Sequence, residues 1–371
     1  MLMNRWTQVK KFIRREIVLC AALVLAAASS LLHTPKASYI DWQVLGVLLS
    51  LMLVVSGLKS VKLLDYLALR LLKSCTAYRQ VTLALVGITF AASMFVTNDV
   101  ALLTFVPLAL VIGRRAHMDM AQVIILQTLA ANLGSMLTPC GNPQNLFLYS
   151  HYDYTAAGFF GVMAWPTLLA VVLIGILVYR RRDAALTLTL QDLPLLDIKL
   201  TAVYLALLVL NLAAVLNGVD KMLALAVTAV AVLVLNRRLF AQVDYVLLVT
   251  FMGFFIFTGN IAHTDVVKYL QSILGTASGT YLAGVFASQF ISNVPAAMLL
   301  AGFTHEADAL LLGVNIGGLG TLIASMASLI SYKLFAAEHP YQAASYLKMF
   351  LYYNFGSLLL LGGAVYFLRI Y

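Results

Sequence analysis

Long apolar runs separated by short polar stretches follow one another along the whole chain. An α-helix needs about 20 apolar residues to cross the hydrocarbon core of a bilayer. The pattern therefore predicts an all-α integral membrane protein with about nine spans. The predicted spans cover residues 17–33, 42–58, 120–148, 157–179, 199–217, 221–236, 244–262, 309–331 and 346–369.

Two further places, residues 80–113 and 280–303, carry a pair of short apolar arms joined by only a few polar residues. Each pair fits either two thin spans or one re-entrant hairpin that enters and leaves on the same side. The basic residues decide between them, because the hairpin interpretation puts most of the 24 Lys and Arg on the cytoplasmic side. This predicts a cytoplasmic N-terminus, a first hairpin that enters from inside, a second that enters from outside, and an external C-terminus.

The chain also repeats itself. Asp41–Leu67 aligns without a gap to Asp244–Leu270, and Asn132-Leu133-Gly134 pairs with Asn315-Ile316-Gly317. Each unit has two spans, an amphipathic connector, a hairpin, an interrupted span and a closing span. An extra span between the units inverts the second one, an organisation typical of secondary transporters. The predicted parts are a cytoplasmic N-terminus (1–16), a first inverted repeat (17–179), a linker with the extra span (180–219) and a second inverted repeat (220–371).

Composition supports a membrane protein and excludes several other classes. The chain is 62% hydrophobic and 11% charged, with a mean hydropathy of +0.94, whereas soluble domains are about 25% charged. The net charge of +9 comes from basic clusters between apolar segments, which indicates topology signals rather than nucleic-acid binding. Three cysteines give no disulfide framework, no pair of histidines has zinc-ligand spacing, and no Gly-Lys phosphate loop suggests ATP drive.

The candidate chemistry lies at the tips of the two hairpins. In both, a hydroxyl residue stands four positions before a second hydroxyl residue, and Asn follows at once. The two copies are Ser93, Thr97, Asn98 and Ser288, Ser292, Asn293. They could be simple turn residues, with each Asn capping the arm that follows it. Polar groups at membrane depth are costly, however, unless they serve a site. Helix N-termini at that depth would suit an anion. Carbonyl, hydroxyl and amide oxygens would suit Na⁺.

A second polar element is Thr138–Asn145, TPCGNPQN, inside the predicted span 120–148. Two prolines and a glycine within eight residues must interrupt a helix, because proline removes an amide and clashes with the preceding turn. Gly141, Asn142 and Asn145 then offer unwound backbone and side-chain oxygens. A structural kink or an extracellular loop is the alternative. The counterpart Thr321–Ser328, TLIASMAS, has no proline, so the second half is expected to be less clearly broken.

Asp99 is the one acidic residue that the pattern places well inside the membrane, and the second hairpin has Val294 at the matching position. A carboxylate at the start of a helical arm is favoured by the helix dipole, so a capping role is one interpretation. The other is a proton- or cation-binding carboxylate that couples ion movement to substrate movement.

These motifs resemble those of the ion transporter superfamily: TND at 97–99, SNVP at 292–295 and GNPQN at 141–145. That group includes divalent-anion/sodium symporters, arsenite-efflux permeases and a class of sodium/proton antiporters. The chain is most similar to short bacterial inner-membrane permeases with a citrate-transporter-like domain. The resemblance implies a multi-pass bacterial inner-membrane protein, a homodimer, and an elevator-like motion of the hairpin-bearing domain.

The resemblance also implies two cation sites. The first would use Ser93, Thr97, Asn98 and backbone near Gly141, and the second Ser288, Ser292, Asn293 and backbone near Ala324. The sequence departs from the dicarboxylate carriers at Asp99 and Val294, where those carriers have threonines that touch the substrate. An acidic residue after Asn is similar to the arsenite and sodium/proton branches.

The sequence thus predicts a secondary active transporter, not an enzyme, that moves a small anion or oxyanion coupled to Na⁺ or H⁺, with no other cofactor. The alternative of the same fold is a sodium/proton antiporter or an arsenite-type efflux permease. A membrane enzyme or receptor is a third class, although no His or second carboxylate joins Asp99 as a nucleophile–base pair. The residues expected to bind substrate or ion are Ser93, Thr97, Asn98, Asp99, Thr138, Gly141, Asn142, Asn145, Ser288, Ser292, Asn293, Thr321, Ala324 and Ser325.

Overall fold

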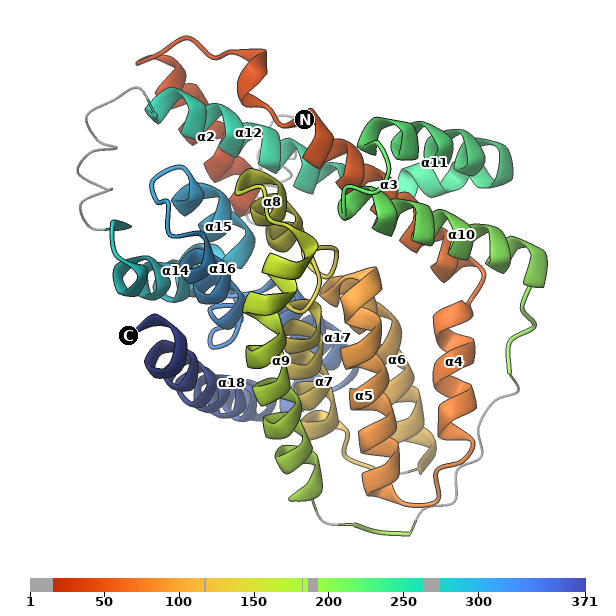
Figure 1. Cartoon of the computed structure of the whole chain (residues 1–371). Coiled ribbons are helices and arrows are strands. Elements are labelled where there is room, and N and C mark those ends of the chain that lie inside the picture. The colour runs from red at the N-terminus through yellow and green to blue at the C-terminus, as the bar shows by residue number, and fades with distance from the viewer. Residues whose placement is uncertain (1–15, 117, 182, 186–192, 263–273) are drawn as a thin grey trace, which may run out of the picture.

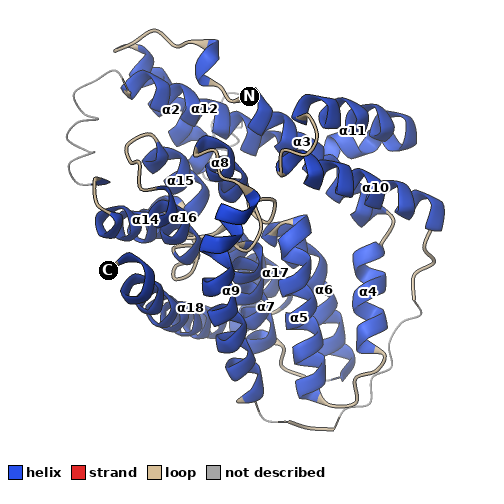
Figure 2. Ribbon diagram, in the orientation of Figure 1, coloured by secondary structure: helices blue, strands red, loops and turns tan. Residues whose placement is uncertain are grey.

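The computed structural model describes residues 16–116, 118–181, 183–185, 193–262 and 274–371. These residues form helices and loops, with no strand beyond an isolated bridge between Ala77 and Ala185 (Figure 2). The predictions for residues 1–15, for residues 186–192 of the linker and for the second amphipathic connector at 263–273 lie outside the described residues. The α-helices are α2 (Ile17–Ser30), α3 (Trp42–Ser60), α4 (Leu63–Leu72), α5 (Tyr78–Val96), α6 (Asn98–Ala116), α7 (Ala121–Ser135), α8 (Pro143–His151), α9 (Ala156–Tyr179), α10 (Ile198–Val215), α11 (Lys221–Asn236), α12 (Tyr245–Ile261), α14 (Ala277–Ile291), α15 (Asn293–Ala301), α16 (Ala307–Ile316), α17 (Met326–Glu338) and α18 (Ala343–Val365).

The all-α membrane fold predicted from the apolar pattern is confirmed. In the described part of the chain, six helices are long and apolar enough to cross a membrane: α3, α5, α9, α10, α11 with its 3₁₀ extension, and α18 with the short helical extensions at both of its ends. The apolar helices α2, α12 and α16 are shorter. One of the six, α5, is an arm of the first hairpin, so that hairpin spans residues 78–116 and its arms are longer than the sequence suggested.

The helices pack in two groups (Figure 1). The first, here called the scaffold group, contains α2, α3, α10, α11 and α12; α2 packs on α12, and α3 packs on both α10 and α11. The second, the hairpin group, contains α5–α9 and α14–α18. The groups touch where α3 meets α8 and α12 meets α15, and α4 joins α3 to the arms α5 and α6.

Within the hairpin group, each hairpin packs on the interrupted helices of both halves of the chain. The first arms stay within their own half, α5 against α7 and α14 against α16. The second arms also cross over, α6 against α17 and α15 against α8. The scaffold group shows the same exchange, since α2 packs on α12 and α11 on α3. Two intertwined repeats would pack in this reciprocal way, although the inverted repeat itself stays a prediction.

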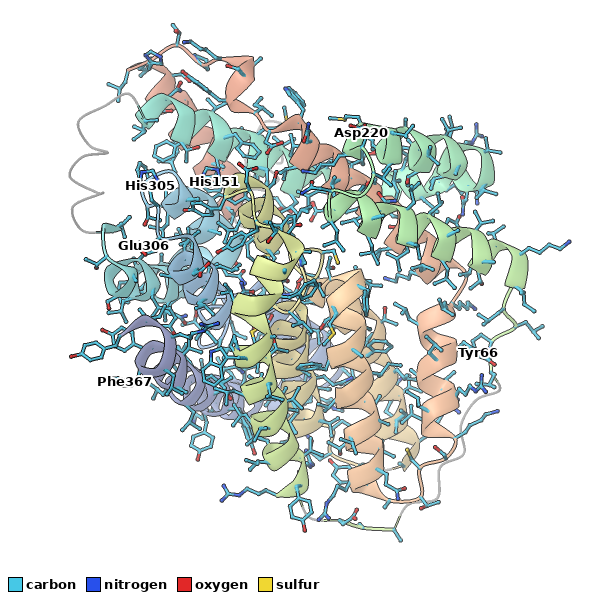
Figure 3. All side chains as sticks on the ribbon, viewed as in Figure 1. Tyr66, His151, Asp220, His305, Glu306 and Phe367 are labelled. Carbon is cyan, nitrogen blue, oxygen red and sulfur yellow. The ribbon has the colours of Figure 1, made fainter. Side chains whose placement is uncertain are left out.

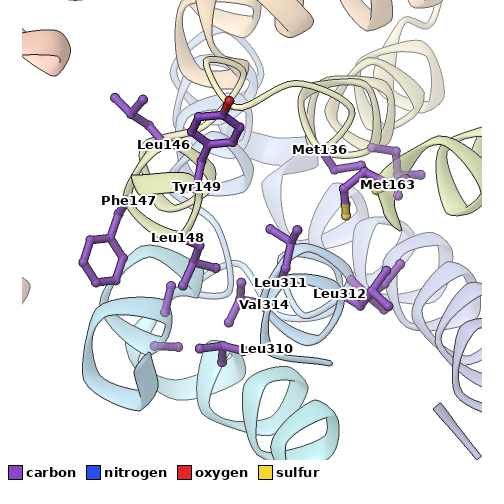
Figure 4. Close-up of a cluster of buried hydrophobic side chains, with 14 of the residues drawn as sticks. Met136, Leu146, Phe147, Leu148, Tyr149, Met163, Leu310, Leu311, Leu312 and Val314 are labelled. Atoms are coloured by element: carbon purple, nitrogen blue, oxygen red, sulfur yellow. The ribbon is translucent and has the colours of Figure 1, made fainter. Parts of the chain in front are cut away.

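Apolar side chains hold the interrupted helices together. Figure 4 shows Leu148 of α8 pointing toward side chains of α16 that include Leu310 and Val314. Charged residues gather instead at helix ends, for example Glu306 before α16 (Figure 3). Large apolar side chains are exposed along α9, α11 and α18, which fits contact with lipid, where only apolar surface is stable.

Candidate functional site

The tip of the first hairpin is a single residue, Thr97, between the end of α5 at Val96 and the start of α6 at Asn98. Thr97 has φ 72° and ψ 153°. This backbone region is essentially reserved for glycine, and a β-branched residue with positive φ is a genuine outlier. A strained hydroxyl residue is therefore held at the turn by the structure around it.

The second hairpin repeats this geometry. Ser292 lies between α14 and α15 with φ 73° and ψ 154°, within a degree of the values at Thr97. Such strain costs on the order of 1–3 kcal/mol per residue and is found mainly at ligand sites and switches. The same non-glycine strain at both tips points to a functional role for the hydroxyl residues.

Each tip is fastened to an interrupted helix by a backbone hydrogen bond. The amide of Asn98 donates to the carbonyl of Gly141 (3.3 Å), and the amide of Asn293 donates to the carbonyl of Ala324 (3.0 Å). Gly141 and Ala324 are the backbone positions that the family resemblance implied. The helices begin at Asn98 and Asn293 rather than after them, so the two asparagines occupy the first helical position and not the cap.

The first break lies between α7 and α8, where the sequence placed it. The Asn145 side-chain amide donates to the carbonyls of Ser135 (3.3 Å), Met136 (3.3 Å) and Thr138 (3.1 Å). Asn142 donates to the hydroxyl of Ser135 (2.5 Å). The expected oxygens at Asn142 and Asn145 are thus present, but their amide nitrogens serve mainly to hold the unwound backbone. An ordinary extracellular loop is excluded, because these residues are buried.

Gly141 is required at its position in this break. A Cβ atom there would lie 2.1 Å from the carbonyl oxygen of Ser135, a backbone atom that has no freedom to move aside. The Thr138 hydroxyl donates to the carbonyl of Met94, near the end of α5. The first break and the first hairpin are therefore joined close to the tip.

The second break, between α16 and α17, is as complete as the first, so the expectation of a less clearly broken second half is wrong. Glycines replace the prolines here, and Gly320 has φ +104°, a conformation that side chains disfavour. The Thr321 hydroxyl donates to the carbonyl of Gln289 (2.9 Å), as Thr138 does to Met94. It also accepts from the amide of Ala324 (3.1 Å).

Buried amides connect the two halves between the tips. The Asn132 side-chain oxygen accepts from the Asn98 side-chain amide (3.0 Å) and from the Ser325 hydroxyl (2.9 Å). Ser325 lies 3.5 Å from the Asn98 side-chain amide, and the neighbouring Ala324 bonds Asn293, so the two hairpin tips contact adjacent residues of the second break. Reciprocal bonds cross between the halves, from Asn132 to Ser328 (3.3 Å) and from Asn315 to Asn145 (2.7 Å).

Ser93 and Ser288 also occupy matching places. Both side chains are fully buried, and each hydroxyl donates to a carbonyl of its own helix, Phe90 for Ser93 (2.8 Å) and Gly284 for Ser288 (2.7 Å). Each hydroxyl oxygen faces a glycine of an interrupted helix. A Cβ at Gly134 would lie 2.7 Å from Ser93 Oγ, and one at Gly317 would lie 2.8 Å from Ser288 Oγ.

Asp99 stands beside the first tip. Its own amide donates to the Asn98 side-chain oxygen (2.9 Å). Its Oδ1 atom is buried and accepts no hydrogen bond from the residues that the structure describes. A capping carboxylate would accept from the free amides of the helix start. The lack of such a bond to Oδ1 leaves that oxygen available to a proton or cation.

The sequence reasoning missed three side-chain amides at the site, of which Asn132 and Gln144 are buried and Gln289 is partly buried. Asn132 entered it only as a marker of the repeat, and Gln289 and Gln144 were not selected. Gln289 contacts the second break, and Gln144 is completely buried with neither side-chain amide atom bonded within the described part of the chain. The available signal was their position, because Gln289 lies within SQFISN and Gln144 within GNPQN, beside the candidate asparagines.

The ligand chemistry of this site is neutral oxygen, apart from Asp99. Among the described residues no three His, Cys, Asp or Glu side chains come together in a way that could hold a metal ion. The groups that converge are backbone carbonyls, hydroxyls and amides, which suit a weakly held alkali cation at a discontinuous helix.

The citrate transporter family model matches residues 1–311. The chain is 31% identical over 302 residues to the uncharacterized transporter MJ0456 of Methanocaldococcus jannaschii, covering 80% of this chain and 81% of that protein. It is also 31% identical over 303 residues to the inner membrane protein YbiR of Escherichia coli, covering 80% of each.

Among solved structures, the crystal structure of the YdaH transporter of Alcanivorax borkumensis, reported to have an unusual topology, has a similar fold. The TM-score is 0.50 at 16% sequence identity, with 96% of this chain and 98% of that chain covered. At this identity the likeness concerns the fold alone.

Proposed function

Since the chain belongs to the citrate transporter family, we propose that this membrane transporter moves a small anion or oxyanion across the inner membrane, coupled to Na⁺ or H⁺. The observation that carries the proposal is the meeting of both hairpin tips with both helix breaks. Asn98 is bonded to Gly141 and Asn293 to Ala324, while Asn98 and Ser325 share Asn132.

The proposed affinity for an anion follows from the helix starts. α6 begins at Asn98, next to Gly141 and hence next to the start of α8. α15 begins at Asn293, next to Ala324 and hence next to the start of α17. Four helix N-termini therefore meet in one region, and the dipole of each helix gives its N-terminus a partial positive charge. A small anion bound among them would be held without a basic side chain.

The proposed cation sites lie on the other side of each tip, where α5 and α14 end. Ser93, Thr97 and Asn98 with Gly141 would supply the first set of oxygens. The matching set is Ser288, Ser292 and Asn293 with Ala324. Two cations bound there would balance the charge of the anion and couple its movement to an ion gradient.

We propose alternating access as the mechanism, with the hairpin group moving as an elevator against the scaffold group. The reciprocal packing of α6 on α17 and of α15 on α8 supports two inverted repeats around one central site. The charge pattern supports a cytoplasmic N-terminus. The E. coli relative that is named an inner membrane protein supports that location. A homodimer is proposed from the family resemblance alone.

One observation favours the second candidate, a sodium/proton antiporter or arsenite-type efflux permease. At the first tip, the Oδ1 atom of Asp99 is buried and has no hydrogen-bond partner among the described residues. The second tip has Val294 at the matching position and so has no such carboxylate. Intramembrane carboxylates of this kind commonly carry protons or cations. An antiporter would use Asp99 to exchange H⁺ for Na⁺ with no anion involved.

Transport by purified protein in proteoliposomes tests the proposal. Citrate, succinate, sulfate, phosphate and arsenite are offered in turn under an imposed Na⁺ or pH gradient, with protein-free liposomes as the control. Uptake or counterflow of one anion that responds to an ion gradient is the expected result. A Na⁺-driven pH change with no anion requirement would favour the antiporter, and no transport of any kind would contradict both.

A further inference from the structure

We propose that Gln289 is a positioning residue that fastens the second hairpin to the second helix break and thereby sets the geometry of the cation ligands there. This inference rests on the proposed function, because it assigns Gln289 a role at the second cation site. Gln289 lies on α14, one turn before the strained tip residue Ser292.

The side chain of Gln289 uses both ends of its amide. Nε2 donates to the carbonyls of Gly317 (2.8 Å) and Leu319 (3.0 Å), which have lost their helical partners where α16 ends. Oε1 accepts from the backbone amide of Thr321 (3.0 Å). One side chain thus satisfies three backbone groups of the unwound segment, each of which would be costly if buried unpaired at membrane depth.

The backbone of the break is shaped to receive this amide. A Cβ atom on Gly320 would lie 2.2 Å from Gln289 Oε1, and Gly320 has φ +104°. Only glycine combines this conformation with the close approach. Gln289 and Gly320 therefore act as a matched pair.

The connection continues to a candidate ligand. Thr321, held by Gln289 at its amide, accepts the amide of Ala324 at its hydroxyl (3.1 Å). The Ala324 carbonyl accepts the amide of Asn293 (3.0 Å) and lies 3.5 Å from the Ser292 hydroxyl. Two hydrogen bonds therefore separate the Gln289 side chain from Ala324, whose carbonyl is a proposed ligand. Nε2 of Gln289 is hydrogen-bonded to the carbonyls of Gly317 and Leu319, so these carbonyls are not free to bind a cation. The cation would therefore bind nearer the tip, at the carbonyl of Ala324.

In the first half, the free carbonyls of the helix break are hydrogen-bonded by a different residue. Met94 stands where Gln289 does, since Thr138 donates to the Met94 carbonyl as Thr321 does to that of Gln289. A methionine side chain has no amide to donate. The carbonyls of the first break are bonded instead by Asn145, which belongs to the interrupted helix itself. Among the described residues, a side-chain amide from a hairpin bonds the carbonyls of the break in the second half and not in the first.

The test uses Gln289→Met, which installs the residue of the first half, in the full chain. The first readout is hydrogen exchange of the backbone amides at 317–325, with 136–142 as the internal reference. Loss of the acceptor for the Thr321 amide is expected to speed exchange in the second break and to leave the first break unchanged. Unchanged exchange at 317–325 would overturn the fastening role.

The second readout is the affinity for Na⁺. It is measured as the rise of the thermal unfolding midpoint with increasing Na⁺ concentration, with choline added to keep the ionic strength constant. A bound ion stabilises the folded state according to its concentration relative to Kd. Removing a residue that supports a ligand commonly weakens ion affinity by about 10- to 100-fold, so the midpoint curve of Gln289→Met is expected to shift to about tenfold higher Na⁺.

The matched control is Gln127→Met. Gln127 is buried and, like Gln289, donates its side-chain amide within the hairpin group. Its partners are the Thr89 hydroxyl (3.2 Å) and the Phe105 carbonyl (3.3 Å), on the arms of the first hairpin and not on the second break. This variant is expected to lose stability but to keep the Na⁺ dependence of the wild type. An equal shift in both variants would reduce Gln289 to a structural residue and overturn the proposal.

If Gln289→Met does not fold, Gln289→Glu replaces it, because it keeps the acceptor for the Thr321 amide and loses the donor to the two carbonyls. The same shift to higher Na⁺ is expected, and an unshifted curve would contradict the inference. A wild type without any Na⁺-dependent stabilisation would also overturn it. In that case the proteoliposome panel still decides the proposed function separately, since transport coupled to H⁺ would remain detectable.

Discussion

The two helix breaks reach one geometry from different residues. The first, Thr138–Asn145, uses two prolines and a self-contained set of bonds from Asn145 to its own carbonyls. The second, Thr321–Ser328 with the glycines before it, has no proline and depends on Gln289 from the neighbouring hairpin. The difference predicts that the first break holds its conformation with its own residues, whereas the conformation of the second depends on its hairpin.

The two tips share one backbone geometry but differ in the chemistry of one side chain. Thr97 and Ser292 share one strained backbone conformation, and both following asparagines dock on a break. The third residue breaks the symmetry, because Asp99 is a carboxylate and Val294 is apolar. The paired geometry therefore supports two similar cation sites, while the single carboxylate gives the first tip a chemistry that the second lacks.

The largest effect is expected from Asp99→Asn, which removes the one carboxylate without changing its size. If Asp99 accepts a proton or cation during coupling, ion-driven transport should fall by at least about 100-fold, as for other groups that transfer protons. Transport against external pH and Na⁺ in proteoliposomes measures this. Val294→Thr at the matching position of the second tip is the control. Unchanged ion dependence in Asp99→Asn would remove Asp99 from the coupling role.

The second-largest effect is expected from Gly141→Ala in the first break. The added Cβ would meet the Ser135 carbonyl oxygen at 2.1 Å, so the backbone must shift. Overpacking of this kind destabilises by about 1–3 kcal/mol, and the Asn98 contact should be lost with it. Gly161→Ala is the control, because nothing lies within 4 Å of a Cβ at that helical position. Thermal unfolding in detergent should separate the two variants; equal midpoints would contradict the tight packing of the break.

Smaller losses of stability are expected from Asn145→Ala and Ser328→Ala, with the greater loss in Asn145→Ala. Asn145→Ala leaves three buried carbonyls without their donor and should cost about 1–3 kcal/mol. Ser328→Ala removes one acceptor for Asn132 and should cost about 1 kcal/mol. Thermal midpoints of the two variants test this order. A larger loss for Ser328→Ala would show that the first break is not held by Asn145.

The smallest effect concerns strain at the tips. Glycine adopts the backbone angles of Thr97 without penalty, so Thr97→Gly should raise stability by about 1 kcal/mol after the entropy of the unfolded chain is counted. Ser292→Gly should gain less, because serine is not β-branched. Both variants lose a proposed ligand and should transport more slowly. A stability loss in Thr97→Gly would mean that the hydroxyl contributes more than the strain costs.

Much of this arrangement could be predicted from the sequence. The apolar pattern gave the helices within a few residues, and the polar motifs at Thr97-Asn98 and Ser292-Asn293 marked both tips. Proline chemistry located the first break. The second break was underestimated, because glycines unwind a helix only when something else holds the released backbone, and that partner is Gln289 from another element.

Contacts between distant segments could not be predicted in this way. Nothing in the local pattern shows that Asn132 will join Asn98 to Ser325, or that Asn315 will bond Asn145. Such pairs depend on the packing of α7 with α16 and α17, which sequence periodicity does not specify. The start of each second arm was also misplaced by one residue, since Asn98 and Asn293 are already helical.

A density map of the full chain with Na⁺ and the anion that the proteoliposome panel identifies tests the central claim most directly. The account predicts anion density among the helix starts at Asn98 and Asn293, with cation density beside Gly141 and Ala324. Ligand density elsewhere in the molecule, with both tips empty, would contradict it.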